Sequence, residues 1–276
     1  MQYILHQHYD LTHTDRTAHD FELECDGIFT TLRTNGNGYY VLFYAQHVTR
    51  LVTSYESKFN KRISGLFPEL FNHALRDVLR KAREEYPNKD FRVACLVDSK
   101  GNLTLHCSIL PLVPASPTKV RLTRHASRTD PTVKDLEWVR QRQDMEKMIC
   151  DGVNEVIMAD EDGNISEGLS SNCFVITEKN GERFVYTAPD DMVLHGTMRF
   201  AAMKAHDLMP YPLKMECANC NDKIVAVGIT STSRGFLVAK ELLVGDEVIP
   251  LETEELLRFS KKFEALLNTN FSYHFQ

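Results

Sequence analysis

The stretch Asn154–Ile176, NEVIMADEDGNISEGLSSNCFVI, carries the pattern from which the fold of the second half of the chain and a candidate site are inferred. Its two apolar segments, Glu155–Ala159 and Cys173–Ile176, predict strands, and DEDGN between them predicts a turn. One carboxylate, Glu167, stands between these strands and is followed by GLSSN. A carboxylate taken out of water needs a partner. The partner could be a cationic ring nitrogen, an arginine or lysine, or water at a strand end, and the small neighbours would let a bound group approach closely.

The composition is that of a globular protein, with 276 residues, 43% of them hydrophobic and 25% charged. This is enough chain for one large or two ordinary domains. The net charge is -6 and the basic residues are spread along the chain, so we expect neither nucleic acid nor a membrane as a partner. No apolar run approaches the roughly 18 residues of a membrane span, and the N-terminal segment is too polar for a secretory signal. The seven scattered cysteines predict reduced thiols in a cytoplasmic protein.

The first half of the chain combines hairpins with helices. Strands are predicted at Ile28–Arg33 and Tyr39–Tyr44 across the turn NGNG. The segment FRVACLVDSKGNLTLHCSIL predicts a second hairpin that turns at Ser99–Asn102. Between the hairpins, residues 68–86 predict a helix with Pro68 in its first turn. Its apolar stripe consists of Leu70, Phe71, Ala74, Leu75, Val78, Leu79 and Ala82.

The proline-rich segment PLVPASPTK marks a predicted domain boundary. We therefore predict a smaller N-terminal α/β domain at 1–113, an interdomain linker at 114–119 and a larger C-terminal domain at 120–276. A helix is also predicted after LHGTMR. The other elements predicted in the second half are strands at 119–125, 155–159, 173–176, 183–187 and 223–229, a short strand near Val248, and helices at about 135–150 and 253–267.

The order of these elements predicts an α+β fold with mostly antiparallel sheets packed with helices. Strands and helices do not alternate as they do in a doubly wound fold. The chain contains neither GxGxxG nor GxxxxGK[ST], so dinucleotide and P-loop sites lose their main support. The irregular histidines near the N-terminus and the isolated pair Cys217 and Cys220 do not indicate a metal site. The absence of GxSxG gives no support to a serine hydrolase.

Lys134, in TDPTVKDLEWV, is a candidate nucleophile. A lone lysine is most often a solvated surface residue. Val133 and Leu136 beside Lys134 would shield it partly, and a shielded amine loses part of its preference for the charged form and can act as a nucleophile. Asp135 could cap the helix predicted to follow.

Two segments could hold an anion. In LHGTMR, the N–H groups of Gly196, Thr197 and Met198 would stand at the positive end of a helix, although Thr197 could equally be an ordinary helix cap. In GITSTSRGF, four hydroxyl residues, Thr230 to Ser233, follow a predicted strand, and they could hold a phosphate or form an ordinary polar loop.

Taken in order, these segments resemble the class IV aminotransferases, which are fold-type IV pyridoxal-phosphate enzymes. That family includes branched-chain and D-amino-acid aminotransferases and aminodeoxychorismate lyase. The similarity extends from DGIFTTLR and HVTRL to TSTSRGF. It implies the two-domain fold-type IV architecture of the D-amino-acid aminotransferases, with pyridoxal 5'-phosphate between the domains and usually a homodimer.

The resemblance also implies roles for single residues. Lys134 matches the lysine that forms a Schiff base with the cofactor and acts as the catalytic base and acid. Glu167 matches the carboxylate that pairs with the pyridine nitrogen, and Arg50, in HVTRL, matches an arginine that binds the phosphate. The remaining cofactor-binding residues implied are Thr197 and Met198 at the helix start and Ser231 and Thr232 on the hydroxyl side.

The substrate is less well defined than the cofactor. Branched-chain enzymes have a tyrosine five residues after the lysine, where this chain has Val139, and FRVACLVDSKGN lacks the RG pair of the D-amino-acid enzymes and the lyase. Arg92 and Arg234 are candidates for holding a substrate carboxylate. The function expected is amino transfer between a branched-chain-like or D-amino acid and a 2-oxo acid. The alternatives are an aminodeoxychorismate lyase-type reaction and a non-catalytic protein of this fold.

Overall fold

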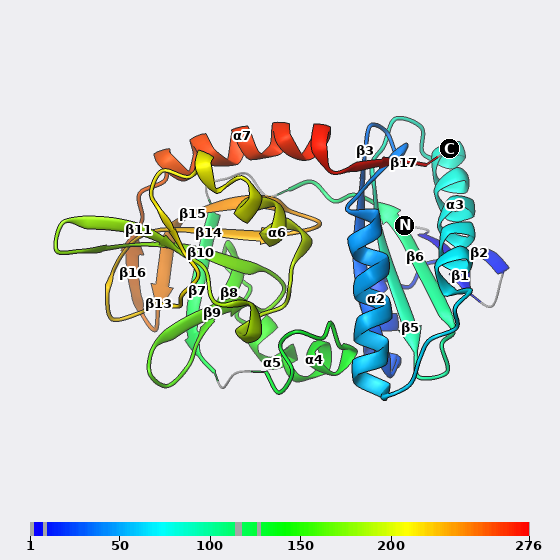
Figure 1. Ribbon diagram of the computed structural model, residues 1–276, viewed down its shortest axis with the longest axis horizontal. Helices are drawn as coiled ribbons and strands as arrows, with labels where there is room; N and C mark the ends of the chain where they lie inside the picture. The colour runs from blue at the N-terminus through cyan, green and yellow to red at the C-terminus, as the bar shows by residue number, and fades with distance from the viewer. Residues whose placement is uncertain (1–2, 8–9, 114–117, 126–127, 276) are drawn as a thin grey trace. The chain divides into compact units, whose positions relative to one another are not determined.

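The chain divides into two compact units by the contacts within it (Figure 1). The computed structural model describes residues 3–7, 10–113, 118–125 and 128–275. Unit 1 comprises Met1–Leu112, Val133–Gln141 and Leu267–Gln276, and unit 2 comprises Val113–Thr132 and Arg142–Leu266. Both units combine sheets with helices, so the α+β prediction is confirmed.

Unit 1 is built from three separate pieces of the chain, whereas the predicted domains are continuous. The piece Val133–Gln141 belongs to unit 1 because its helix packs against the helix Ala18–Glu24 (α1) and the strand Gly27–Asn35 (β3). The piece Leu267–Gln276 belongs there because its strand Ser272–His274 (β17) pairs with the strand Tyr40–Leu42 (β4). Of the predicted linker, residues 114–117 lie outside the described residues. Lys134 is therefore part of unit 1, although it lies in the predicted C-terminal domain.

The sheet of unit 1 has the strand order β17-β4-β3-β5-β6-β1-β2, and the pairings found in it are antiparallel. Both predicted hairpins are confirmed, since β3 pairs with β4 and β5 pairs with β6. The strands are β1 Tyr3–Gln7, β2 Asp10–Thr14, β3 Gly27–Asn35, β4 Tyr40–Leu42, β5 Phe91–Asp98, β6 Leu103–Ile109 and β17 Ser272–His274. The helices are α1 Ala18–Glu24, α2 Tyr44–Phe59, α3 Phe67–Glu85 and α4 Leu136–Gln141.

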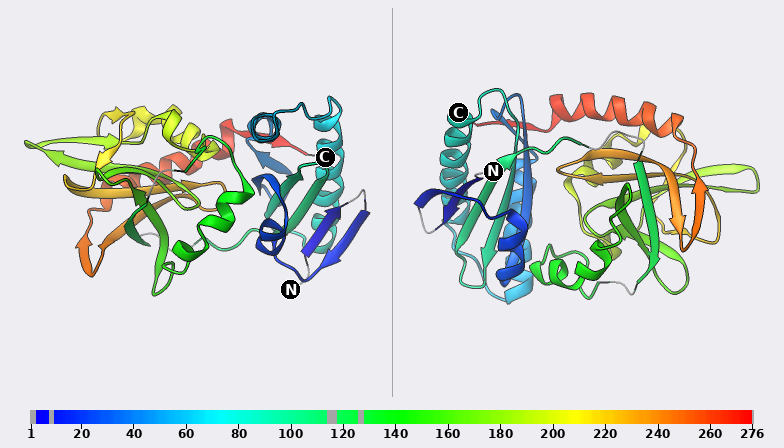
Figure 2. Two further views of the ribbon diagram at one scale, coloured as in Figure 1. Left: turned by 90° about the horizontal axis from the view of Figure 1, so that it is seen from below. Right: turned by 180° about the vertical axis from the view of Figure 1, so that it is seen from behind.

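Helices cover both faces of this sheet, with α2 and α3 on one side and α1 on the other (Figures 1 and 2). The strand period of two sorts the side chains between the faces. In β5, Cys95 and Val97 lie in the core under α2 and α3, whereas Ala94 and Leu96 lie in the core under α1 and α4. Burial of each large apolar side chain stabilises the fold by about 1.5–3 kcal/mol. The stripe predicted for α3 is buried except for Leu70, which is 42% exposed.

The sheet of unit 2 has the strand order β12-β11-β10-β14-β15-β7-β8-β9-β13, with β16 paired to β15. Most pairs are antiparallel, but β7 runs parallel to both β8 and β15, and β11 runs parallel to β12. The strands are β7 Thr118–Arg124, β8 Val153–Ala159, β9 Asn164–Gly168, β10 Asn172–Lys179, β11 Glu182–Tyr186, β12 Leu213–Lys214, β13 Ala218–Asn219, β14 Lys223–Ser231, β15 Gly235–Val244 and β16 Glu247–Pro250. The helices that begin in unit 2 are α5 Gln143–Glu146, α6 Thr197–Lys204 and α7 Glu254–Asn270, with 3-10 turns at Asp190–Met192 and His206–Leu208.

Four of the described strands of unit 2, β9, β12, β13 and β15, were absent from the sequence interpretation. NISEG forms β9, which pairs with β8 on one side and touches β10 on the other, through Glu167 and Asn172. Glu167 therefore lies within a strand rather than between two strands. Because β9 contacts both β8 and β10, the path β10-β14-β15-β7-β8-β9 returns to its start and brings Glu167 beside Asn172.

The single helix predicted at about 135–150 is wrong. The chain forms α4, breaks at Arg142, where it passes from unit 1 to unit 2, and then forms the short α5. Arg142 is buried, and its guanidinium donates to the Leu169 carbonyl at 2.6 Å and to Glu146 at 2.8 Å. The local sequence QRQDMEKM contains no helix breaker, so the tertiary contacts of Arg142 determine this break.

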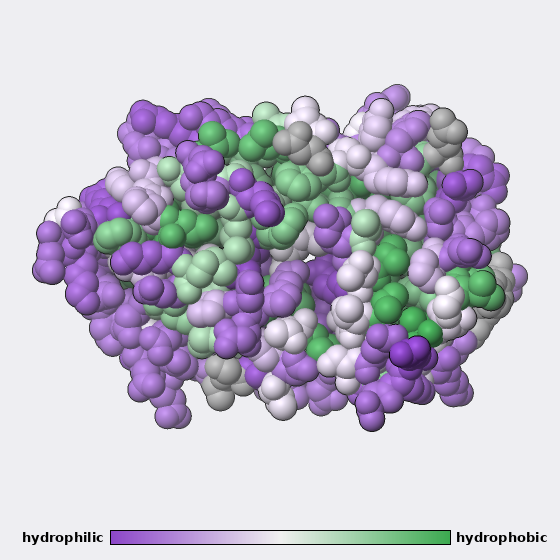
Figure 3. Space-filling model, viewed as in Figure 1, coloured by the Kyte–Doolittle hydropathy of each residue, from purple (hydrophilic) through white to green (hydrophobic). Residues whose placement is uncertain are grey.

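The surface is mainly hydrophilic on the face shown in Figure 3, with hydrophobic residues visible over the region of α2 and α3. Leu66 and Leu70 are among the exposed large apolar residues of unit 1. Single exposed apolar side chains are normal for globular proteins. Among the helices of the described residues, none has the length and hydropathy needed to cross a membrane.

Candidate active site

Glu167 is buried at the end of β9, with only 4% of its surface exposed. Arg128 donates from Nη1 to Glu167 Oε1 at 3.0 Å, and the Arg128 side chain is itself buried. The other oxygen, Oε2, accepts from the Leu194 N–H at 3.1 Å and from Asn172 Nδ2 at 3.4 Å. One partner of this carboxylate is thus an arginine. An arginine or lysine was one of the three partners considered from the sequence, beside a cationic ring nitrogen and water. No sequence pattern singled out Arg128.

The small residues near Glu167 make room for polar side chains that pack against the backbone. Asn172 Nδ2 also donates to the Leu194 carbonyl at 2.9 Å. A Cβ atom at Gly196 would overlap Asn172 Oδ1, and one at Gly168 would overlap the Ser171 hydroxyl. A side chain at either glycine would therefore have to displace a neighbouring polar side chain. Asn172 joins the strand that carries Glu167 to the segment LHGT that precedes α6.

The start of α6 has the properties of an anion site. Its N-cap is Gly196, which makes no side-chain cap hydrogen bond, so the alternative of Thr197 as the cap is wrong. A helix start without a side-chain cap leaves first-turn N–H groups available to an anion. The Thr197 hydroxyl lies 3.3 Å from that of Thr232. The structure thus brings together Thr197 and Thr232, which come from two segments distant in sequence.

Ser231 and Thr232 lie at the turn between β14 and β15. The Arg234 N–H donates to the Ser231 carbonyl at 3.2 Å, and Arg234 Nε donates to Ser231 Oγ at 3.0 Å. Gly235 follows with φ +68°, in the left-handed region that glycine adopts without strain. The run of hydroxyl residues is therefore a hairpin turn whose shape depends on Arg234.

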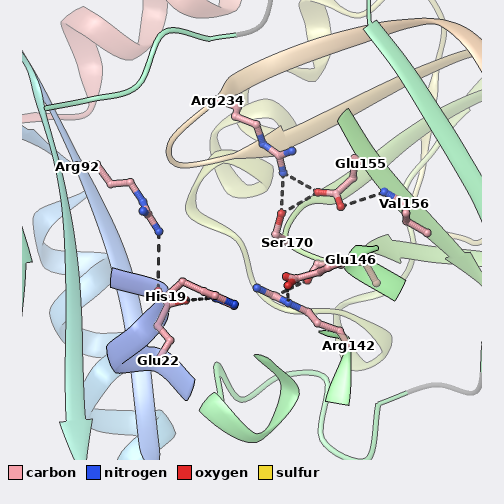
Figure 4. Close-up of polar contacts among 10 residues, drawn as sticks. His19, Glu22, Arg92, Arg142, Glu146, Glu155, Val156, Ser170 and Arg234 are labelled. Atoms are coloured by element: carbon pink, nitrogen blue, oxygen red, sulfur yellow. Dashed lines mark hydrogen bonds and ion pairs between the residues drawn. The ribbon is translucent and has the colours of Figure 1, made fainter. Parts of the chain in front are cut away.

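The two arginines predicted to hold a substrate carboxylate are directed at internal carboxylates (Figure 4). Arg234 Nη2 lies 2.6 Å from Glu155 Oε2, and Glu155 is fully buried. Arg92 Nη2 lies 3.8 Å from Glu22 Oε1, and Glu22 is also buried. A substrate carboxylate would have to compete with these protein charges, so the geometry argues against the predicted role of both arginines.

In unit 1, Arg50 is held by Thr30 and His47. Arg50 Nη2 donates to Thr30 Oγ1 at 3.0 Å and to His47 Nδ1 at 2.8 Å. Burial lowers the pKa of Arg50 to about 10, so it remains charged at neutral pH. His47 and Arg50 are three residues apart on α2 and share one face of the helix. This spacing in HVTRL was the available signal for His47, whose role the sequence interpretation missed.

Lys134 lies at the edge of the unit 1 sheet. Its carbonyl accepts from the Phe29 N–H at 3.0 Å, and its Nζ lies 4.4 Å from the centroid of the Phe29 ring, a cation–π contact. The next residue, Asp135, accepts from the Glu137 N–H at 2.7 Å, so its predicted role as a helix cap is confirmed. Asp135 also binds Lys58 at 2.6 Å. Backbone and side-chain contacts therefore fix the segment that carries Lys134.

Solved structures share the fold of the whole chain. A fold IV transaminase from Curtobacterium pusillum is 15% identical, with a TM-score of 0.75 over 98% of this chain and 100% of that chain. A branched-chain aminotransferase from Thermoproteus uzoniensis, solved with norvaline, is 15% identical, with a TM-score of 0.73 over all of both chains. A PLP-bound hypothetical aminotransferase from Mycobacterium tuberculosis is 14% identical, with a TM-score of 0.76 over 96% of this chain and 99% of that chain. The fold is therefore that of the fold-type IV aminotransferases.

The family follows from the sequence model of class IV amino-transferases, which matches residues 27–242. The chain belongs to this family, and the resemblance identified from the sequence is confirmed. No curated protein matches the chain. The matched region includes Arg50, Lys134, Glu167, Thr197 and Thr232.

Proposed function

We propose that this protein is a pyridoxal 5'-phosphate-dependent aminotransferase, which transfers an amino group between an amino acid and a 2-oxo acid. The observation that carries the proposal is the connection, within unit 2, of a buried carboxylate to a helix start that has no side-chain cap. Glu167 accepts from the Leu194 N–H, and Leu194 lies two residues before Gly196, the N-cap of α6. Membership of the class IV family supports the same function.

The residues present fit this cofactor. A pyridine nitrogen calls for a carboxylate, which Glu167 supplies, and a phosphate calls for N–H and hydroxyl donors. Thr197 and Thr232, with hydroxyls 3.3 Å apart, and the start of α6 supply those donors. When bound, the cofactor would supply an electron-accepting ring for the reaction at the substrate carbon. In unit 2, the residues that would hold it are Thr197, Met198, Ser231 and Thr232 for the phosphate and Glu167 for the ring nitrogen. The sequence resemblance assigns two residues of unit 1 to the same cofactor, Arg50 for the phosphate and Lys134 for the aldehyde.

The chain's own groups would act as follows. Glu167, oriented by Arg128 and Asn172, would accept a hydrogen bond from the ring nitrogen and favour its protonated form. Lys134 would take the proton from the substrate α carbon and deliver it again, as general base and then acid. The phosphate donors would hold the cofactor in one position without taking part in the chemistry.

The substrate proposed is a branched-chain-like or D-amino acid. The position where branched-chain enzymes have a tyrosine is Val139, which is fully buried in a core cluster of unit 1 with Phe21 and Phe29. Val139 supplies no polar group for recognition, so the substrate must be found by experiment. Each enantiomer of a panel of amino acids, supplied with 2-oxo acids, would identify the donor.

The purified protein should bind pyridoxal phosphate and absorb visible light in the region typical of a lysine-bound cofactor. Lys134→Ala should abolish this absorbance and lower amino transfer by about 10²–10⁴-fold, because it removes both the anchor and the proton carrier. Lys147→Ala, a change at an exposed lysine, is the matched control and should leave both properties unchanged. A wild-type protein that takes up no pyridoxal phosphate would refute the proposal.

Two alternatives have distinct outcomes. Release of pyruvate from aminodeoxychorismate without amino transfer would indicate the lyase reaction. If Lys134→Ala left the biological role intact, the protein would act without catalysis. The homodimer expected from the resemblance also stays a prediction, which light scattering of the purified protein would measure.

A further inference from the structure

We propose that Arg234 is a positioning residue that fixes the hydroxyl turn of unit 2 and thereby presets it for the cofactor phosphate. This inference rests on the proposed function and deepens it. The hydroxyl turn is defined as residues 231–234, between β14 and β15. Arg234 would act through Ser231 and Thr232 and would touch neither cofactor nor substrate.

The guanidinium of Arg234 joins three segments of unit 2 (Figure 4). Its Nε donates to Ser231 Oγ within the hydroxyl turn at 3.0 Å. Its Nη1 donates to the Asn154 carbonyl on β8 at 2.8 Å. Its Nη2 donates to Glu155 Oε2 on β8 at 2.6 Å and to Ser170 Oγ, between β9 and β10, at 2.8 Å. The planar fork of an arginine can make these bonds at once, which a lysine cannot.

Glu155 anchors this arrangement in the core. It is fully buried, and its Oε1 accepts from the Val156 N–H at 3.1 Å while its Oε2 accepts from Ser170 Oγ at 2.8 Å. A Cβ atom at Gly168 would lie 2.9 Å from Glu155 Cγ, so the backbone next to Glu167 packs directly against Glu155. The ion pair between the partly exposed Arg234 and the buried Glu155 therefore supports both the strand of the ring-nitrogen carboxylate and the turn of the phosphate hydroxyls.

These contacts separate a positioning role from a substrate-binding role. All three nitrogens of Arg234 are engaged by protein acceptors. Turning the guanidinium toward a substrate would leave the Glu155 charge buried without its partner, which is strongly unfavourable. Loss of Arg234 should therefore loosen the hydroxyl turn and weaken the binding of the cofactor phosphate. Recognition of the pyridine ring and its aldehyde should remain largely intact.

The test is to titrate cofactor-free protein separately with pyridoxal phosphate and with pyridoxal, which lacks the phosphate. The absorbance of the bound compound gives the Kd of each. In Arg234→Lys the positive charge beside Glu155 remains, but the bonds to Ser231 and Asn154 cannot all be kept. We expect the Kd for pyridoxal phosphate to rise about 10-fold or more, the equivalent of one or two lost hydrogen bonds. The Kd for pyridoxal should change by less than about 3-fold, which corresponds at most to the low end of the free energy of one hydrogen bond.

The matched control is Arg183→Lys. Arg183 is also a multiply bonded arginine of unit 2, with Glu178 and Glu252 as partners, but it lies on β11 and contacts neither candidate cofactor segment. Its substitution should change neither Kd. Circular dichroism and thermal unfolding would verify that each variant is folded. If Arg234→Lys does not fold, the double variant Glu155→Gln, Arg234→Gln removes both charges together and is judged by the same criteria.

Other outcomes overturn the inference. Unchanged Kd values with a raised KM for amino acid or oxo acid would make Arg234 a substrate-binding residue. Equal losses for pyridoxal and pyridoxal phosphate would make it a general structural residue. A wild-type protein that binds pyridoxal phosphate, together with an Arg234→Lys variant that binds it equally well, would reject the inference alone. A wild-type protein that binds neither would reject the proposed function itself.

Discussion

At the residue scale, Thr30, His47 and Arg50 define one another's protonation. An arginine can only donate hydrogen bonds, so His47 Nδ1, at 2.8 Å from Arg50 Nη2, must be the acceptor. The His47 proton is therefore on Nε2, and the Thr30 hydroxyl lies 2.7 Å from Nδ1. Burial, together with the charges of Arg50 and Lys134, holds the pKa of His47 well below its ordinary value. A neutral His47 is the state that can hold Arg50.

His47 should make stability depend on pH. Below about pH 6.5 the unfolded chain protonates this imidazole, whereas the folded chain does so only at its lowered pKa. The free energy of unfolding should therefore fall as pH falls through this window, by about 1.4 kcal/mol per pH unit. His47→Asn keeps an acceptor for Arg50 and cannot titrate, so urea unfolding between about pH 5 and 7 should show a shallower slope. Other histidines contribute equally to both proteins, and identical slopes would contradict the prediction.

Residue types visible in the sequence gave the candidates, but their partners depend on the fold. Glu167 was singled out by its position, while Arg128, its ion-pair partner, occupies an unremarkable loop. Arg234 was noticed as a charge next to a hydroxyl run, yet the carboxylate that it binds, Glu155, is distant in sequence. Which side chains become partners in this way depends on how distant segments of the chain pair. The local sequence pattern does not reveal that pairing.

At the element scale, the segment GLSSN and the segment LHGT act as one structure. Asn172 binds both Glu167 and the Leu194 carbonyl, and its amide oxygen fills the space beside Gly196. The helix start at Gly196 and the carboxylate of Glu167 are therefore positioned by the same side chain.

Gly196→Ala should disturb this structure because the added methyl group would overlap Asn172 Oδ1. Movement of Asn172 would weaken its bonds to Glu167 and Leu194. We expect a loss of about 1–3 kcal/mol in the free energy of unfolding, as for other overpacked sites, and weaker binding of pyridoxal phosphate. Gly65→Ala is the control, since nothing lies within 4 Å of a Cβ there. Denaturant unfolding would measure both, and equal stabilities would count against the close packing described.

Elements with strong periodicity could be predicted, and elements set by long-range pairing could not. The stripe of α3 and the hairpin turns of unit 1 are local patterns, and both are found. β9 has only five residues with a charge among them, and β17 is a three-residue strand that exists through its pairing with β4. The parallel neighbours of β7 also depend on the path of the whole chain.

At the scale of the whole molecule, each unit has its own hydrophobic core, and the C-terminal segment contributes to both. Phe259, on α7 in unit 2, is 1% exposed and lies 4.9 Å from Phe236 and 5.6 Å from Phe263 by ring centroids. Phe275, beyond β17 in unit 1, is 2% exposed and lies 5.0 Å from the Tyr44 ring. Two buried rings close together in sequence thus belong to different cores.

These two phenylalanines provide a test of how independent the units are. Phe275→Ala and Phe259→Ala should each cost about 3–5 kcal/mol, because each leaves a cavity in a close-packed core. Hydrogen exchange should then report local loss of protection. For Phe275→Ala the loss should appear in β3, β4 and α2 of unit 1, and for Phe259→Ala in β14 and β15 of unit 2. Each variant is the control for the other. If both variants lost protection evenly along the chain, the two cores would unfold as one cooperative system, and the division into units would not describe its energetics.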